Sequence, residues 1–527
     1  MAIKLSLPRV APTPDPKVET RTVYVEEWVE SLAYANPPAL LDQTIEAIER
    51  LNQQPLKPTL RAELLDLHVR PYAYALEFRR TQEPARTSTA LARQRAVSRR
   101  LRLTAIAMAL GYKQALSDLT ARKSVFGGAK ELRAMLQRSL LFSSLALLHC
   151  YDEYRPTLPR LWLEAVALYK FAARSQLHEE PVACPVDEPL FSQSTADCFK
   201  RLCLTSLVDP YHLAYGELWT VYRDFGRYAA QAAIGEVEEV KRLAGRFVID
   251  PTVDRRPAPL AQVQRAPASH CRLLDANPVL NMLRERHRNG AAGDDLPSHV
   301  LAAMIRALGL PPKRHTPRES TDGRVRVAAG LSTVHHFLGG GESAARGRGG
   351  NDTDIEIGDV AGPAGAHGVS YRHEAWDLVN EGPGGVGILK RARPDNPVGV
   401  GELIGMQFPL RGDAEDEWSL GVVRWLNIGS DEEYQVGVQL LGEAVTPVMA
   451  YSESVTNTIT RIPRPTLAMP GLGADPSYTL ITPRGMFARG NRLRINTRTG
   501  TWLVEAIAAS ESTATFDRFT YRIVDDV

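Results

Sequence analysis

The segment Pro311-Pro312-Lys313-Arg314-His315-Thr316-Pro317-Arg318 leads into the strand-like run Arg324-Val325-Arg326-Val327-Ala328. This leader cannot form one continuous helix, because Pro317 lacks a backbone N–H and restricts the residue before it. Its two arginines, Arg314 and Arg318, are four positions apart. The chain therefore changes here from a polar, proline-rich segment into β-structure.

Three more β-type runs follow the leader, at 380–388, 420–425 and 434–440. The first begins with Asn380-Glu381-Gly382-Pro383-Gly384-Gly385. Taken with Arg314 and Arg318, this order resembles the PilZ family, whose small β-barrels bind the bacterial second messenger cyclic di-GMP. The family pattern is R-x-x-x-R, then [D/N]-x-S-x-x-G, then a late strand ending in a G-V-x-F-like sequence.

The resemblance implies a ligand-binding site made of Arg314, Arg318, Asn380, Gly382 and Gly385. Cyclic di-GMP carries two guanines and two phosphodiesters, and guanidinium groups can pair bidentately with both kinds of acceptor. By resemblance, the two arginines clamp the ligand from a leader that wraps over the barrel mouth. Asn380 fits the family's D/N position, and Gly385 fits the closing glycine, where the main chain approaches closely. Gly382 stands where the family has serine, so a hydroxyl donor is missing.

Two alternatives remain open for the second motif. A register that starts at Asp377 also lacks the serine, and the Asn380 register is preferred because a strand follows it directly. Asn380 can also be a plain turn residue.

The motifs are 62 positions apart, from Arg318 to Asn380, and residues 339–370 between them contain ten glycines. This composition cannot bury much apolar surface, so it predicts an insertion inside the barrel.

The 527 residues predict about three or four domains. We expect an α+β multidomain protein with an all-α N-terminal region, a PilZ-like antiparallel β-barrel and a small C-terminal β module. The expected boundaries are an extended tail at 1–23, an α-helical region at 24–250, a linker with short helices at 251–310, the barrel at 311–450 with its glycine-rich insertion, and the β module at 455–527.

Local patterns support the helical region. Asn36 is a predicted N-cap with Pro37 at the first helical position, and that helix should stop near Gln54. Helical pieces are also expected from Leu218 to Arg246. Further along, His335-His336-Phe337 is expected to end the first barrel strand, which would place its two histidines on opposite faces.

The cysteines and histidines predict no metal site and no catalytic residue. The chain has five cysteines, which indicates reduced thiols, and Cys198 and Cys203 have no second pair at zinc-finger spacing. His270-Cys271 lacks any acid or oxyanion context that would make it a nucleophilic pair. No motif of a known enzyme class is present, so we expect no enzyme and no cofactor.

Charge and hydropathy limit the partners. Sixty-three Lys+Arg balance 61 Asp+Glu, which is unlike a typical nucleic-acid binder. Residues 79–138 nevertheless contain fourteen Lys/Arg, so nucleic-acid binding through these helices remains an alternative. The start of the chain lacks a signal-peptide pattern, and the longest apolar run, 140–150, is too short to cross a bilayer. We expect a cytoplasmic protein without membrane insertion.

The sequence therefore predicts a bacterial cyclic di-GMP effector. Ligand binding would order the leader and change the orientation of the helical region relative to the barrel. This change of orientation would control a protein partner of unknown identity. A ligand-independent PilZ-like interaction scaffold is the main alternative. The output pathway, the oligomeric state and the ligand stoichiometry do not follow from the sequence.

Overall fold

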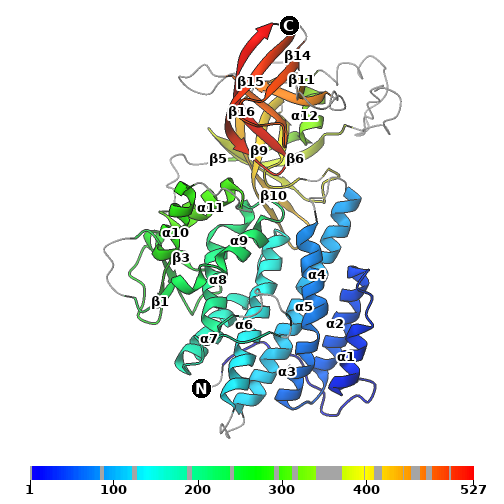
Figure 1. Ribbon diagram of the computed structural model, residues 1–527, viewed down its shortest axis with the longest axis vertical. Helices are drawn as coiled ribbons and strands as arrows, with labels where there is room; N and C mark the ends of the chain where they lie inside the picture. The colour runs from blue at the N-terminus through cyan, green and yellow to red at the C-terminus, as the bar shows by residue number, and fades with distance from the viewer. Residues whose placement is uncertain are drawn as a thin grey trace. The chain divides into compact units, whose positions relative to one another are not determined.

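The chain divides into two compact units, Met1–Lys313 and Arg314–Val527 (Figure 1). The computed structural model describes residues 3–82, 88–121, 128–184, 186, 193–237, 243–289, 296–310, 319–339, 371–396, 398–408, 418–442, 444–452, 463–469, 478–497 and 500–526. The division falls between Lys313 and Arg314, inside the proline-rich leader.

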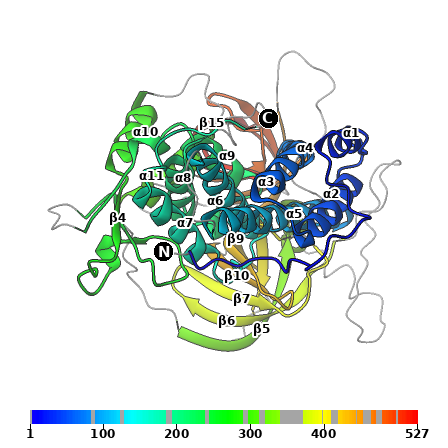
Figure 2. The same ribbon diagram turned by 90° about the horizontal axis from the view of Figure 1, so that it is seen from below.

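The first unit is mainly helical, as the sequence predicts. Helix α5 packs between α2 and α6 (Figure 2), and α6 is buried along most of its length. Asn36 caps α2, because its side chain accepts a hydrogen bond from the N–H of Ala39 at 3.3 Å. The helices are α1 (Thr22–Glu30), α2 (Pro37–Gln53), α3 (Pro58–Leu67), α4 (Val69–Thr81), α5 (Ser88–Ala121), α6 (Ala129–Asp152), α7 (Leu161–Arg174), α8 (Thr195–Leu207) and α9 (Glu217–Phe225).

The basic block at 79–138 is largely engaged in ion pairs. Two of these pairs are buried: Arg79–Asp152 at 2.8 Å and Lys113–Glu164 at 2.7 Å. A buried charge is costly unless it is paired, so loss of one partner from either pair would destabilise the helix packing. Of the eleven basic residues in this block that the structure describes, at least seven pair with carboxylates, namely Arg79, Arg80, Arg100, Arg102, Lys113, Arg133 and Arg138.

A small antiparallel sheet completes the first unit. The prediction of helical pieces from Leu218 to Arg246 is wrong at 229–235, because the chain there forms a 3-10 turn and a strand. Within the predicted linker at 251–310, residues 251–269 contain a strand and a 3-10 turn. The sheet order is β1-β4-β2-β3, with β1 (Ala233–Gly235), β2 (Arg246–Ile249), β3 (Ala258–Pro259) and β4 (Arg272–Asp275), and helices α10 (Asn277–Asn289) and α11 (Ser298–Leu308) follow.

The second unit begins with a closed six-stranded antiparallel barrel. Strand β5 alternates between buried and more exposed residues toward its end, whereas β8 is buried along its whole length. Its order is β10-β7-β6-β5-β8-β9. The strands are β5 (Glu319–Ala329), β6 (Glu374–Gly382), β7 (Gly385–Lys390), β8 (Leu403–Gln407), β9 (Trp418–Ile428) and β10 (Tyr434–Gly442).

The prediction for His335-His336-Phe337 is wrong, because these residues lie in helix α12 (Leu331–Leu338). Gly330, at φ +89°, separates the helix from the end of β5. Val334 and Phe337 then fall on one helix face and are buried. The His335 Nε2 atom lies 3.0 Å from the carbonyl oxygen of Val448.

A second closed barrel follows, in the order β11-β12-β13-β16-β15-β14. It includes β11, which starts before residue 455. Both barrels contribute to one apolar cluster that holds them together, with Leu403 and Leu420 from the first and Leu467 and Phe516 from the second. The strands are β11 (Thr446–Ser452), β12 (Arg464–Met469), β13 (Thr479–Pro483), β14 (Arg492–Asn496), β15 (Thr501–Ser512) and β16 (Phe516–Asp526). Across the described ranges, no helix has the length and hydropathy needed to span a bilayer.

Candidate functional site

The hairpin of β6 and β7 carries the second predicted motif. β6 ends at Gly382 and β7 begins at Gly385, and these two glycines are register partners. Pro383 and Gly384 therefore form a two-residue turn. Asn380 lies in β6 just before this turn. The structure thus brings Asn380, Gly382 and Gly385 to one end of a single hairpin.

Gly385 is required by the packing of the strands. A Cβ atom on Gly385 would lie 2.3 Å from the carbonyl oxygen of Val438 in β10. A Cβ on the neighbouring Gly384 would meet no atom within 4 Å. The close backbone approach expected at Gly385 is therefore an approach of β10.

The two arginines of the first motif, Arg314 and Arg318, lie outside the described residues. The described chain resumes at Glu319, which is the register partner of Glu381, and the next residue, Ser320, is the partner of Asn380. β5 therefore begins beside the second motif.

Asn380 belongs to a set of register partners that crosses five strands. Residues directly opposite one another in a sheet have their side chains on the same face. The alternating positions in β7 and β10, such as Ile388 and Val436, are buried inside the barrel, so this set lies on the outer face. Its members, called the cross-strand row below, are Ser320, Asn380, Gly387, Gly437 and Trp425.

The two glycines of the cross-strand row leave space that its larger side chains fill. A Cβ on Gly387 would lie 2.8 Å from both terminal atoms of the Asn380 amide. A Cβ on Gly437 would lie 1.8 Å from Trp425 Nε1 and 2.2 Å from Cε2. The amide and the indole therefore lie directly against the glycine backbone. The Trp425 side chain is partly exposed, so the row forms a polar and aromatic surface.

Irregularities in the strands set the direction of these side chains. The register of β6 shifts between Leu378 and Asn380, and the register of β10 against β9 shifts between Gly437 and Val438. β-Bulges twist a strand and redirect its side chains, and they occur often near binding sites. Both shifts adjoin members of the cross-strand row.

Charged residues near the row are already paired. Arg391 contacts Asp377 at 3.2 Å, so the first residue of the alternative register pairs with a cation. Arg424 donates to Gln439 at 2.7 Å and to Glu511 of the second barrel at 3.1 Å.

Glu319 and Glu381 stand in register at the start of β5. Opposed carboxylates repel each other, which favours cations at this point.

Sequence reasoning missed Gly387, Gly437 and Trp425. Each lies inside a run that reads as a strand, and the glycines alternate with valine or isoleucine. Their significance depends on the register between strands that are distant in sequence, so only the structure brings them together with Asn380.

Comparison with known families agrees with this architecture. Residues 24–239 match "Cyclic-di-GMP receptor FimW, N-terminal domain". Residues 246–354 and 361–447 match "Cyclic-di-GMP receptor FimW, middle PilZ domain", and residues 465–524 match "FimW C-terminal beta-barrel domain". The middle match includes the β5–β10 barrel, and the last match falls within the second barrel.

A curated relative supports the same family. The cyclic-di-GMP receptor FimW of Pseudomonas aeruginosa (strain PAO1) is 30% identical over 158 residues, which are 30% of this chain and 25% of the relative. The match thus spans a quarter of that relative's length. No solved structure matches the chain significantly. With a PilZ barrel between a helical domain and a second barrel, the chain belongs to the PilZ-domain proteins of the FimW family.

Proposed function

We propose that this chain is a cyclic di-GMP receptor whose ligand binds on the outer face of the first barrel, at the cross-strand row. The observation that carries the proposal is the register of β5 against β6. It brings Glu319, the residue after Arg318, next to the strand position of Asn380. On this basis we expect both halves of the PilZ motif to meet at this end of the barrel. The FimW family matches support the same ligand.

The residue chemistry suits a doubly anionic dinucleotide. Arg314 and Arg318 offer planar guanidinium forks for phosphate oxygens or for guanine O6 and N7. The Asn380 amide can donate and accept at a base edge. Gly382 offers only its backbone N–H where the family pattern has serine.

Trp425 adds a stacking surface to this site. Its indole rests against Gly437 and is partly exposed, so a guanine can stack on its outer side. Stacking of a base on an aromatic side chain contributes about 1–3 kcal/mol. The Gly437 backbone holds the indole close to the barrel, which reduces the freedom that the ring loses on binding.

Isothermal titration of cyclic di-GMP into the full chain tests the proposal. Arg314→Ala and Arg318→Ala should each weaken binding by at least about tenfold, because a charge-assisted hydrogen bond contributes about 1.5–3 kcal/mol. The thermal unfolding of the ligand-free protein should stay nearly unchanged. Arg489→Ala is the matched control, since Arg489 is an exposed arginine between β13 and β14 of the second barrel. Wild-type affinity in both leader variants would overturn the site.

We also propose that ligand capture couples the barrel to the helical unit. The two compact units divide between Lys313 and Arg314, so the arginines that would hold the ligand directly follow the helical unit. A ligand that orders this leader changes the arrangement of the units only by its differential affinity for the alternatives. Small-angle scattering with and without cyclic di-GMP should differ in wild type and agree in Arg314→Ala. The resulting surface would engage a protein partner.

A ligand-independent interaction scaffold is the second candidate, and it is favoured by glycine at position 382. The absence of any heat on adding cyclic di-GMP to folded protein would decide for it. The ion pairs of the basic block give no support to nucleic-acid binding, because most of its described cations already contact carboxylates.

A further inference from the structure

Three chemically distinct side chains meet at the edge of the small sheet in the first unit. Asp250 directly follows β2, and His270 and Cys271 directly precede β4. These two strands are antiparallel neighbours, with Ile249 opposite Arg272. The ladder therefore brings together residues that are about twenty positions apart in sequence. It supplies the acid that His270-Cys271 lacks in the linear sequence.

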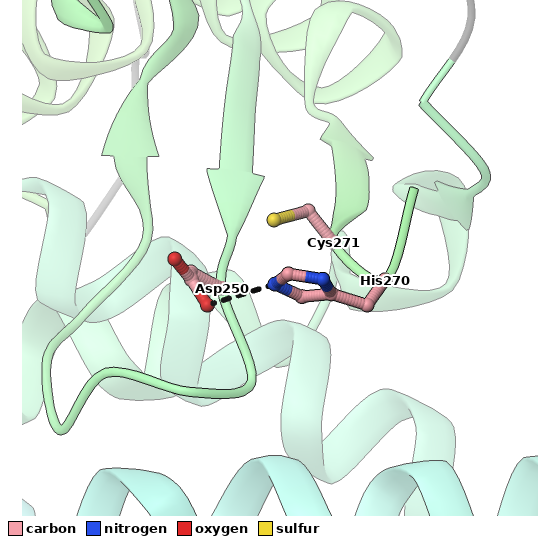
Figure 3. A group of neighbouring side chains, drawn as sticks. All are labelled: Asp250, His270 and Cys271. Atoms are coloured by element: carbon pink, nitrogen blue, oxygen red, sulfur yellow. Dashed lines mark ion pairs between the residues drawn. The ribbon is translucent and has the colours of Figure 1, made fainter. Parts of the chain in front are cut away.

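Figure 3 shows the three side chains pointing toward one another. One ligand atom from each, among the carboxylate oxygens, the imidazole nitrogens and the thiol sulfur, lies within 4.8 Å of the others. The Asp250 Oδ1 atom is 3.7 Å from His270 Nε2. This separation is too long for a hydrogen bond. It is near the roughly 3.4 Å expected between two ligands of one tetrahedral ion with bonds of about 2.0–2.1 Å.

The ligand types favour zinc over magnesium or calcium. A thiolate, an imidazole and a carboxylate form a mixed S, N, O set, whereas magnesium and calcium prefer oxygen ligands. A thiolate and a carboxylate together neutralise a divalent cation, and the imidazole binds in its neutral form. Without a metal, burial raises the pKa of the Cys271 thiol, which makes it a poor nucleophile.

The surroundings hold the ligands in place. Asp250 Oδ1 accepts hydrogen bonds from the N–H and the hydroxyl of Thr252, at 2.9 and 2.6 Å. Such partners orient a ligating carboxylate. Cys271 is 3% exposed and packs with Val248 and Leu273, whereas the His270 side chain is 49% exposed. An ion can therefore enter from the histidine side and reach a sulfur in apolar surroundings.

We propose that Asp250, His270 and Cys271 form a zinc-binding site, with a water or an external ligand in the fourth position. The zinc site joins the two ends of the segment 251–269, because Asp250 precedes this segment and His270 and Cys271 follow it. This segment contacts the helices through Asp254. The Asp254 Oδ1 atom accepts hydrogen bonds from the N–H groups of Trp162 and Leu163 at the start of α7, both at 3.1 Å. Bound zinc thus stabilises the attachment of the sheet to the helical bundle. This role is independent of any ligand at the barrel.

The test uses the full chain, stripped with a chelator and then titrated with Zn²⁺. We expect one equivalent to bind and the thermal transition to rise, because an ion that binds only the folded state stabilises it. Cobalt(II) in place of zinc should give a thiolate-to-metal charge-transfer absorption. His270→Asn, at a half-exposed position, and Cys271→Ser should lower zinc affinity by more than the roughly 10–100-fold that loss of an outer-shell partner costs.

Cys184→Ser is the matched control, because it removes another thiol of the same unit and should leave zinc binding unchanged. Cys271→Ser should abolish the cobalt charge-transfer band even if some metal still binds. Two results would overturn the site. One is a wild-type protein that binds no zinc. The other is a folded His270→Asn variant with wild-type zinc affinity and thermal shift.

Discussion

The two barrels have the same number of strands but differ in where they use glycine. The strands of the first barrel contain eight glycines, and those of the second contain none. Glycine weakens a strand unless close approach of another group requires it. In the first barrel Gly437 receives the Trp425 indole and Gly387 receives the Asn380 amide. The second barrel places larger side chains at every strand position.

The two barrels therefore use the same six-stranded arrangement in different ways. A strand without glycine maximises side-chain packing, as the apolar cluster around Leu480 and Phe519 illustrates. A strand with glycine allows another side chain to lie flat on the backbone. The comparison therefore predicts that the first barrel carries ligand recognition, and that the second contributes packing and stability.

The largest expected difference between the two barrels is in how stability depends on pH, through a desolvated carboxyl next to the first barrel. Glu402 directly precedes β8, and desolvation of its carboxyl raises its pKa from 4.5 to about 7. In the second barrel, Asp517 accepts from the N–H of Gly485 at 2.7 Å. The folded state holds the Glu402 proton more tightly than the unfolded chain does. Stability is therefore fully present below about pH 4.5 and falls as the pH rises to about 7.

The loss should reach up to about 3 kcal/mol, since one pKa unit corresponds to about 1.4 kcal/mol. Urea unfolding of the full chain at both ends of this pH window measures it. Glu402→Gln should remove this part of the difference between stability at low and at neutral pH. A variant with an unchanged pH dependence would show that Glu402 ionises freely in the folded protein.

Substitutions in the β6–β7 turn test whether the glycines are required. Gly385→Ala should destabilise the protein by about 1–3 kcal/mol, as overpacking typically does, because its Cβ would lie 2.3 Å from the backbone oxygen of Val438. Gly384→Ala, at the next residue, should be near neutral because the space there is open. Thermal unfolding of both variants measures the contrast. Equal melting temperatures would mean that β7 and β10 can separate at little cost.

The two partly exposed tryptophans of the barrels, Trp425 and Trp502, test where the ligand binds. Trp425→Ala should weaken cyclic di-GMP binding by about 1–3 kcal/mol, the usual contribution of base stacking. Trp502→Ala is the matched control in β15 and should leave the affinity unchanged. Isothermal titration compares the two. A larger loss of affinity in Trp502→Ala would move the ligand to the second barrel and reverse the comparison.

The same contrast explains how much could be predicted from the sequence. Strand runs such as Tyr434–Leu440 and the order of the two motifs are local patterns, so the PilZ-like barrel follows from the sequence alone. The α12 prediction failed because the run Val334–Phe337 is short, and its apolar residues fit a helix turn as well as a strand. Gly330 was the missed signal, since its positive φ ends β5 there.

Sites that depend on register could not be predicted. Trp425 and Asn380 are members of one row only because β7 and β10 lie between them and two bulges adjust the pairing. Asp250 reaches His270 and Cys271 only through the β2–β4 ladder. In each case the sequence presents the residues separately, and long-range strand pairing brings them together.

The smallest expected effect comes from restoring the motif serine. Gly382 does not have the positive φ that would require glycine, so serine fits its backbone. A new hydroxyl donor at the ligand contributes about 0.5–1.5 kcal/mol, which corresponds to roughly a two- to tenfold gain in affinity. Gly382→Ser should therefore bind cyclic di-GMP more tightly by isothermal titration.

Gly323→Ser in β5 is the control, because its Cβ would meet no atom within 4 Å and it lies outside the motif. It should leave the affinity unchanged. A gain in Gly382→Ser alone would mean that the serine position contacts the ligand, and would sharpen the contrast with the second barrel. No gain would mean that the backbone N–H at position 382 already makes the contact, or that the ligand approaches the cross-strand row from the Trp425 side.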